Sequence, residues 1–195
     1  GLEICIATAY VVLMKYILWI LILLIGTPAS ADCVVLIHGL ARSPKSFVVM
    51  KAALEGIGYD VVNVKYPSRK NSIEELSMSV LPDVVESCKD AKKIHFVTHS
   101  LGGILVRYYM QNTDVRPENL GHVVMLGPPN KGSPVVDKLG TVPGFGLWNG
   151  IAGSQLGTVP TSVPNMLGPV DFSLGVIAGN NSVSPIFSTL IDGDD

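Results

Sequence analysis

Short segments that are apolar along their whole length recur after residue 32, and they limit the folds open to this chain. A strand with one face in water alternates apolar and polar residues, whereas a strand of a parallel sheet covered on both faces is apolar throughout. These segments therefore predict buried strands of a parallel sheet. They are Val34–Ile37, Val61–Tyr66, Ile94–Thr98, Val123–Leu126 and Leu174–Ala178.

Helical patterns separate the predicted strands. One helix is expected to open at Ser43-Pro44 and to end at Gly56 and Gly58, and another covers 103–111. Between them, Ser72-Ile73-Glu74-Glu75 forms a capping box that starts a helix, which Pro82 should kink or split. Alternating strands and helices predict an α/β fold with a mostly parallel central sheet flanked by helices on both faces.

The N-terminal segment has the layout of a secretory signal peptide. Lys15 follows Met14, an apolar run extends over 16–25, and 29–31 reads Ala-Ser-Ala. We expect translation to start at Met14, with residues 1–13 as upstream sequence, and cleavage after Ala31 to release the protein to the periplasm or the medium. The alternative is a retained membrane anchor over 4–25, although a central Lys costs roughly 2.5–3.5 kcal/mol on insertion scales.

Residues 32–195 form the expected folded domain. The full chain has 195 residues, 15% of them charged, and a net charge of −2, so no basic surface points to nucleic acid. Cys33 and Cys88 remain after cleavage, and in an exported protein they are candidates for a disulfide, the alternative being two buried free thiols. The Gly- and Pro-rich insertion over 141–169 is expected to be a functional cover or a disordered segment.

Ser100 lies between the predicted strand 94–98 and the predicted helix 103–111. A strand, a sharp turn and a helix form the setting in which a nucleophilic serine is exposed at the edge of a sheet. The turn needs small residues nearby, which Gly102 supplies, and the helix N-terminus favours negative charge near the hydroxyl. The alternative is that Ser100 only caps the helix.

A second element lies about 60 residues earlier, at His38-Gly39-Leu40. A tetrahedral oxyanion needs two backbone N–H donors. Leu101, directly after the serine, would provide one, and Leu40, in the loop after the first strand, the other. His38 would lie on the oxyanion side and is a poor candidate for the base; the alternative is a strand-end residue without a role.

These motifs resemble those of the α/β-hydrolases, in particular the small bacterial lipases and esterases with "HG" and "HSxGG" sequences. The resemblance covers 34–195 and rests on VVLIHGLARS, YPS, FVTHSLGGILVR and VVMLGPPNKGS. Thr98 stands where the family usually has a glycine. The family implies that the loop 128–133 lines the acyl site, with Pro129, Asn130, His38 and His99 lining the substrate, although a rigid proline turn is the alternative for that loop.

The resemblance also implies a triad in the order Ser, acid, His. Asp195 is the best acid candidate, followed by Asp194 and Asp192, and the alternative is a solvated acidic end. None of the four histidines, His38, His95, His99 and His122, follows the acid. We therefore expect a chain truncated before its catalytic His and inactive as written.

The sequence thus predicts a serine esterase or lipase that forms an acyl-enzyme on Ser100 and needs neither a metal nor an organic cofactor. Its partners would be ester or lipid substrates, with transient membrane contact, and nothing indicates an oligomeric state. One alternative is a membrane-associated acyltransferase or lipid deacylase. Another is a non-catalytic binding protein of the same fold.

Overall fold

The computed structural model describes residues 14–15 and 30–179. The chain divides into two units, residues 1–30 and residues 31–195, and each is considered by itself. In the first unit, Met14 and Lys15 are helical. The signal-peptide core and the three acid candidates Asp192, Asp194 and Asp195 lie outside the described residues. In the part of the chain that is described, no helix combines the length and hydropathy that crossing a bilayer requires.

The second unit is built on a sheet of five parallel strands in the order β2-β1-β3-β4-β5. The parallel sheet expected from the apolar segments is therefore confirmed. In register, Ile37 at the end of β1 pairs with Thr98 near the end of β3, so the carboxyl ends of these strands meet at one edge of the sheet. The strands are β1 Cys33–Ile37, β2 Asp60–Val64, β3 Ile94–His99, β4 Leu120–Leu126 and β5 Leu174–Ile177.

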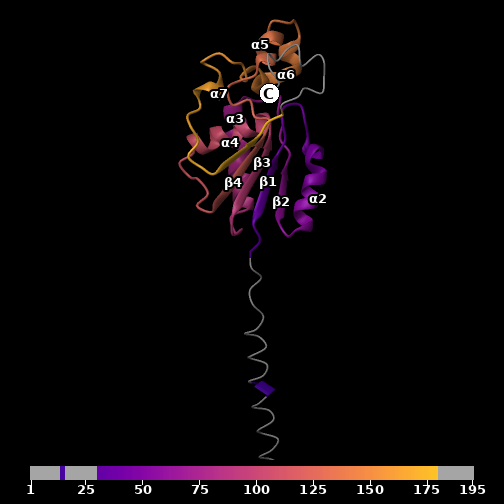
Figure 1. The fold of residues 1–195 in the computed structure, drawn as a ribbon, viewed down its shortest axis with the longest axis vertical. Coiled ribbons are helices and arrows are strands. Elements are labelled where there is room, and N and C mark those ends of the chain that lie inside the picture. Colours follow the sequence, from indigo (N-terminus) through magenta and orange to yellow (C-terminus); the bar gives the residue numbers. More distant parts are fainter. Residues whose placement is uncertain (1–13, 16–29, 180–195) are drawn as a thin grey trace, which may run out of the picture. The chain divides into compact units, whose positions relative to one another are not determined.

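Helices cover both faces of this sheet (Figure 1). Helices α3 (Ile73–Ser87) and α4 (Leu101–Asn112) pack together on one face, where the larger core contains Phe96, Leu105 and Met125. The 3-10 helix η1 (Pro44–Phe47) and α2 (Val48–Gly56) lie on the other face. There Phe47 packs with Val34 and Leu36 in a smaller core.

Helix α3 begins as its sequence predicts. The Oγ atom of Ser72 accepts from Glu75 N at 3.1 Å, and Ser72 N donates to Glu75 Oε2 at 3.0 Å, so the capping box is confirmed. Pro82 does not split the helix, which continues to Ser87. The fully buried neighbour Leu81 explains this, because packing of α3 on the core outweighs the backbone hydrogen bond that proline removes.

The insertion over 141–169 contains ordered helices. Helix α5 (Pro134–Gly140) precedes it, and α6 (Phe145–Ser154) and α7 (Val163–Met166) lie within it. Figure 1 shows α5 and α6 beyond the carboxyl ends of the strands, where a cover would lie. Side-chain bonds shape the segment: the carboxylate of Asp137 accepts from Thr158 N, and the amide of Asn165 donates to Thr158 O and Val159 O.

A disulfide joins Cys33, the first residue of β1, to Cys88, which caps the end of α3. The two Cα atoms are 5.9 Å apart and the sulfurs are buried in the larger core. The bridge ties the start of β1 to α3 on the larger-core face.

Candidate active site

Ser100 forms the sharp turn between β3 and α4. Its backbone has φ 50° and ψ −120°, in a region that few residues other than glycine adopt. Ser100 N donates to Leu126 O at 2.9 Å and Ser100 O accepts from Gly103 N at 3.0 Å, which hold the turn in place. The Ser100 side chain makes no capping hydrogen bond to α4. This geometry does not match a residue whose only role is to cap a helix.

Two glycines allow β1 and its loop to approach this turn closely. A Cβ atom at Gly102 would lie 2.5 Å from Ile37 O, and one at Gly39 would lie 2.7 Å from His99 Nδ1 and 3.2 Å from Ser100 Cβ. Any side chain at these positions would force the backbone or its neighbours apart. A small residue was expected at Gly102 because the turn at Ser100 is sharp. The structure gives a further reason, which the sequence did not reveal: the end of β1 lies against this position.

The residue Thr98, unusual for this turn, is accommodated by a third glycine. Thr98 is fully buried, and a Cβ at Gly103 would lie 3.2 Å from its Oγ1 and 3.1 Å from Met125 Sδ. The space that a side chain at Gly103 would need is therefore filled by Thr98 and Met125.

The two amides expected to bind an oxyanion lie on either side of this junction. Leu101 is the first residue of α4, and Leu40 follows β1 in the adjacent loop. Within residues 30–179, neither Leu40 N nor Leu101 N has a hydrogen-bond acceptor. Neither amide is therefore used in a hydrogen bond between described residues.

The Leu40 loop is held by two residues of the segment after β2. Ser68 Oγ accepts from Ala41 N at 3.1 Å, and Ala41 itself has φ 53°. Tyr66 Oη donates to His38 O at 2.5 Å. Burial raises the pKa of Tyr66, so the phenol keeps its proton and remains a donor at neutral pH.

Ser100 opens onto a cleft of about 1240 Å³. The nearby wall contains Leu40, His99, Pro129 and Asn130. Much of the remaining lining comes from α5, from the start of α6 and the turn between them, and from Leu156 beyond α6, and it is mainly apolar. Its residues include Val135, Val136, Leu139, Val142, Phe145 and Leu156.

His38 does not line this cleft, contrary to expectation. Its side chain is 1% exposed and stacks on Tyr66 with ring centroids 4.3 Å apart. Its Nδ1 donates to Gly39 O at 2.9 Å, and burial lowers its pKa despite that bond. The His38 ring therefore packs against Tyr66 in the interior and supports the Leu40 loop, and it does not face the Ser100 cleft.

His99 does line the cleft, and the structure favours its neutral form. Burial lowers its pKa most, and the positive charge of Arg42 lowers it further, as would a proton on His38. His99 directly precedes the serine in the chain. No hydrogen bond between a histidine ring and Ser100 Oγ occurs in the described part of the chain.

The other two histidines lie near the opposite edge of the sheet. His95 Nε2 is 3.3 Å from Asp32 Oδ2, and His95 Nδ1 accepts from His122 N at 2.9 Å. His122 Nδ1 bonds Ser173 Oγ at 2.8 Å. Asp32, His122 and Ser173 flank the beginnings of strands, whereas Ser100 follows the end of one.

A buried arginine fixes the loop that carries Pro129 and Asn130. Arg107, on α4, is 9% exposed, and its Nη1 donates to Asn130 Oδ1 at 3.0 Å and to Asn130 O at 3.3 Å. Its Nη2 donates to Leu167 O and Gly168 O, each at 3.2 Å. Helix α4, which begins directly after Ser100, thus also anchors the loop after β4 and the end of the insertion over 141–169.

Sequence reasoning missed three of these supporting residues: Tyr66, Ser68 and Arg107. The first two belong to the stretch YPS, and Arg107 closes FVTHSLGGILVR, so both motifs contained the signal. Their roles depend on partners 23 to 61 residues away in the chain, which a local pattern does not reveal.

Comparisons with known proteins agree with this architecture. A family model described as alpha/beta hydrolase fold matches residues 32–155, while no curated protein matches the sequence. The mature lipase BlEst2 of Bacillus licheniformis superposes with a TM-score of 0.58 at 19% identity, over 83% of this chain and 70% of that one. The phospholipase PlaB of Legionella pneumophila superposes with a TM-score of 0.56 at 20% identity, over 70% of this chain and 35% of that one.

Proposed function

Because this chain belongs to the α/β-hydrolase family, we propose that it is a serine hydrolase that cleaves carboxylic esters through an acyl-enzyme on Ser100. The observation that carries the proposal is the Ser100 turn, with φ 50° at the end of β3, on a cleft of about 1240 Å³. A strained backbone at a cleft is typical of catalytic residues. The hydrolase fold and its lipase and phospholipase neighbours are consistent with this chemistry.

In this proposal Ser100 Oγ attacks the ester carbonyl carbon and loses its proton to a general base. The carbonyl oxygen becomes an oxyanion that Leu40 N–H and Leu101 N–H stabilise. Collapse expels the alcohol, which takes up a proton, and leaves an ester on Ser100 that water then hydrolyses to the acid. We assign the role of base to none of His38, His95, His99 and His122.

A fluorophosphonate probe tests the proposal on the full-length protein. We expect one adduct, located by peptide mass spectrometry at Ser100 and absent from Ser100→Ala. Ser133→Ala is the matched control, because Ser133 also lines the cleft and its loss should leave labelling unchanged. No adduct on a folded protein, or equal labelling of Ser100→Ala, would contradict the proposal and support a non-catalytic binding protein.

A second candidate function keeps the nucleophile but places it at a membrane, as a lipid deacylase or an acyltransferase. Exposed apolar side chains on the cover favour it, with Leu147 92% exposed and Val142, Ile151, Val159 and Met166 also in water. Such side chains can insert into a lipid surface. If phospholipids, or alcohols as acyl acceptors, outcompete soluble p-nitrophenyl esters, this function is favoured over a soluble esterase.

A further inference from the structure

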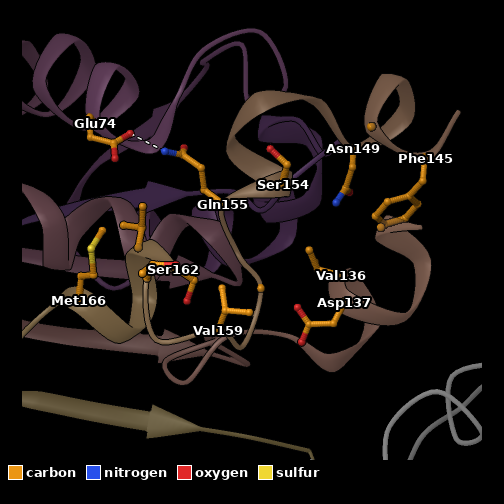
Figure 2. A pocket seen from close by; sticks show the side chains of 15 residues that line it. Glu74, Val136, Asp137, Phe145, Asn149, Ser154, Gln155, Val159, Ser162 and Met166 are labelled. Atoms are coloured by element: carbon orange, nitrogen blue, oxygen red, sulfur yellow. Dashed lines mark hydrogen bonds between the residues drawn. The ribbon is translucent and has the colours of Figure 1, made fainter. Parts of the chain in front are cut away.

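A second cavity, of about 540 Å³, adjoins the Ser100 cleft. Val136, Phe145 and Asn149 line both spaces, so they form the wall between them. Figure 2 shows Asn149 and Phe145 at one end of this cavity and Glu74 with Gln155 at the other. The second cavity is therefore the immediate neighbour of the space in which a ligand at Ser100 would lie.

Asn149 carries an amide donor that no other described residue satisfies. Its Nδ2 atom is buried and has no hydrogen-bond partner among residues 30–179. Leaving such a donor unpaired costs about 1–3 kcal/mol, so an acceptor on a ligand at this atom would stabilise the complex. In Figure 2 the amide nitrogen points toward Val136, one of the residues shared by the two spaces.

The packing around Gly153 places this amide close to the loop of Leu40. A Cβ atom at Gly153 would be 2.8 Å from Asn149 Nδ2 and 2.8 Å from Leu40 Cδ2. Both groups thus flank the same small space. The Asn149 amide therefore lies beside the side chain of Leu40, and both residues line the Ser100 cleft.

The charges around the cavity determine which ligands it can accept. Glu74 and Asp137 line it, whereas none of the described lining residues is Lys, Arg or His. Glu74 Oε2 accepts from Gln155 Nε2 at 2.7 Å, and Asp137 accepts from Thr158 N at 3.1 Å. These bonds fix both carboxylates in place without neutralising them.

Glu74 is ionised at neutral pH. Burial raises its pKa, but hydrogen bonds from Gln155, from its own backbone N–H and from Ser72 together hold the pKa below its ordinary value. The cavity consequently repels anions and attracts cations, and the ring of Phe145 adds a surface on which a cation can rest.

We propose that the second cavity is the subsite for the alcohol portion of the substrate, that Asn149 Nδ2 donates to an oxygen of the bound ester, and that the preferred alcohol carries an ammonium group. The identification of the ligand as an ester rests on the proposed function. The charge preference of the cavity does not, because it depends only on Glu74, Asp137 and Phe145.

Two isosteric esters test the charge preference directly. Choline butyrate carries a quaternary ammonium group, and 3,3-dimethylbutyl butyrate has a carbon in its place. Calorimetric titration of Ser100→Ala, which cannot turn them over, should give at least tenfold tighter binding of choline butyrate at low salt. Equal affinities, or tighter binding of the neutral ester, would overturn the proposal.

Variants in the Ser100→Ala background assign the effect to residues. Glu74→Gln and Asp137→Asn should each reduce the affinity ratio at least threefold, whereas Asp171→Asn, outside both spaces, should leave it unchanged. Asn149→Leu should weaken both esters alike by about tenfold, the order expected for one lost hydrogen bond. Asn112→Leu, on the exposed end of α4, is its control. An unchanged ratio in both carboxylate variants, or unchanged affinities in Asn149→Leu, would contradict the assignment.

The outcomes separate this inference from the proposed function. A selective cavity in a protein whose Ser100 does not react with fluorophosphonate would uphold the preference of the cavity for an ammonium group and reject the hydrolase. A reactive Ser100 with no preference between the two esters would uphold the hydrolase and reject the subsite.

Discussion

At the scale of single residues, the candidate site depends on the close approach of backbones around Ser100. The serine adopts φ 50° because β3 must turn into α4 within one residue. Gly39 and Gly102 let the loop and the end of β1 lie against that turn. The geometry of the site therefore depends on glycines, where a side chain would clash, as well as on the side chains that line the cleft.

Replacing Gly102 tests this close approach. The Cβ of Gly102→Ala would meet Ile37 O at 2.5 Å, so β1 and α4 must separate. We expect a loss of about 1–3 kcal/mol in the free energy of unfolding, as for overpacked cores, and at least tenfold slower fluorophosphonate labelling. Gly56→Ala, at the end of α2 with nothing near its Cβ, should instead leave labelling unchanged. Normal labelling of Gly102→Ala would show that the approach is not needed.

Two histidines whose pKa values are lowered make stability depend on pH. The pKa values of His38 and His99 are lowered, chiefly by burial, so below about pH 6.5 the unfolded chain binds more protons than the folded one. The free energy of unfolding should therefore fall as the pH drops from 7 to 5, by up to about 1.4 kcal/mol per pH unit for each histidine. Urea titrations across this range measure the slope. His38→Asn should make it shallower, and an unaltered slope would mean that His38 is not the group responsible.

At the scale of elements, loops of the site are held by side chains from other segments. Tyr66 and Ser68, after β2, hold the loop of Leu40, and Arg107 of α4 holds the loop of Asn130. The sheet brings these segments to one edge, and hydrogen bonds then fix their conformation. The positions of the Leu40 and Asn130 loops therefore depend on residues that do not line the Ser100 cleft.

Ser68→Ala tests the support of the oxyanion loop. It leaves Ala41 N–H without its acceptor in a loop where Ala41 has φ 53°. We expect a loss of about 1–3 kcal/mol in stability and slower labelling of Ser100, as the Leu40 amide loses its fixed position. Ser46→Ala, whose hydroxyl bonds Ser43 O on the surface, serves as the control. If both variants label at the wild-type rate, Ser68 does not support the site.

The disulfide between β1 and α3 should stabilise the second unit. It closes a loop with a sequence separation of 55, which restricts the unfolded chain. Replacing both Cys33 and Cys88 by Ala should cost about 2–4 kcal/mol, and reductant should lower the urea midpoint of the wild type only. Equal midpoints for the wild type with and without reductant would argue against a stabilising bridge.

At the scale of the whole molecule, the sheet was predictable because its signal is local. The apolar segments identified all five strands, although β2 ends two residues earlier than expected, at Val64, and β4 begins three earlier, at Leu120. The capping box at Ser72 is equally local. The turn at Ser100 could be identified from the sequence because its signals are local too: an apolar strand precedes it, and Gly102 and Gly103 follow it.

The cover and the supporting contacts were less accessible to sequence reasoning. Helices α6 and α7 lie in a Gly- and Pro-rich segment, and they pack through contacts such as Gln155 Oε1 with Ile73 N, 82 residues away. The prediction for His38 was wrong because it also depended on a distant contact. Its position after β1 indicated that it would line the cleft, but its ring stacks on Tyr66, which belongs to another segment. Contacts between distant segments decide where such side chains point.

The most direct measurement of the central claim is a crystal structure of the protein after reaction with a fluorophosphonate. The account predicts a bond from Ser100 Oγ to phosphorus, with the phosphonyl oxygen about 2.7–3.1 Å from both Leu40 N and Leu101 N. An adduct on another residue, or a phosphonyl oxygen directed away from these two amides, would contradict it.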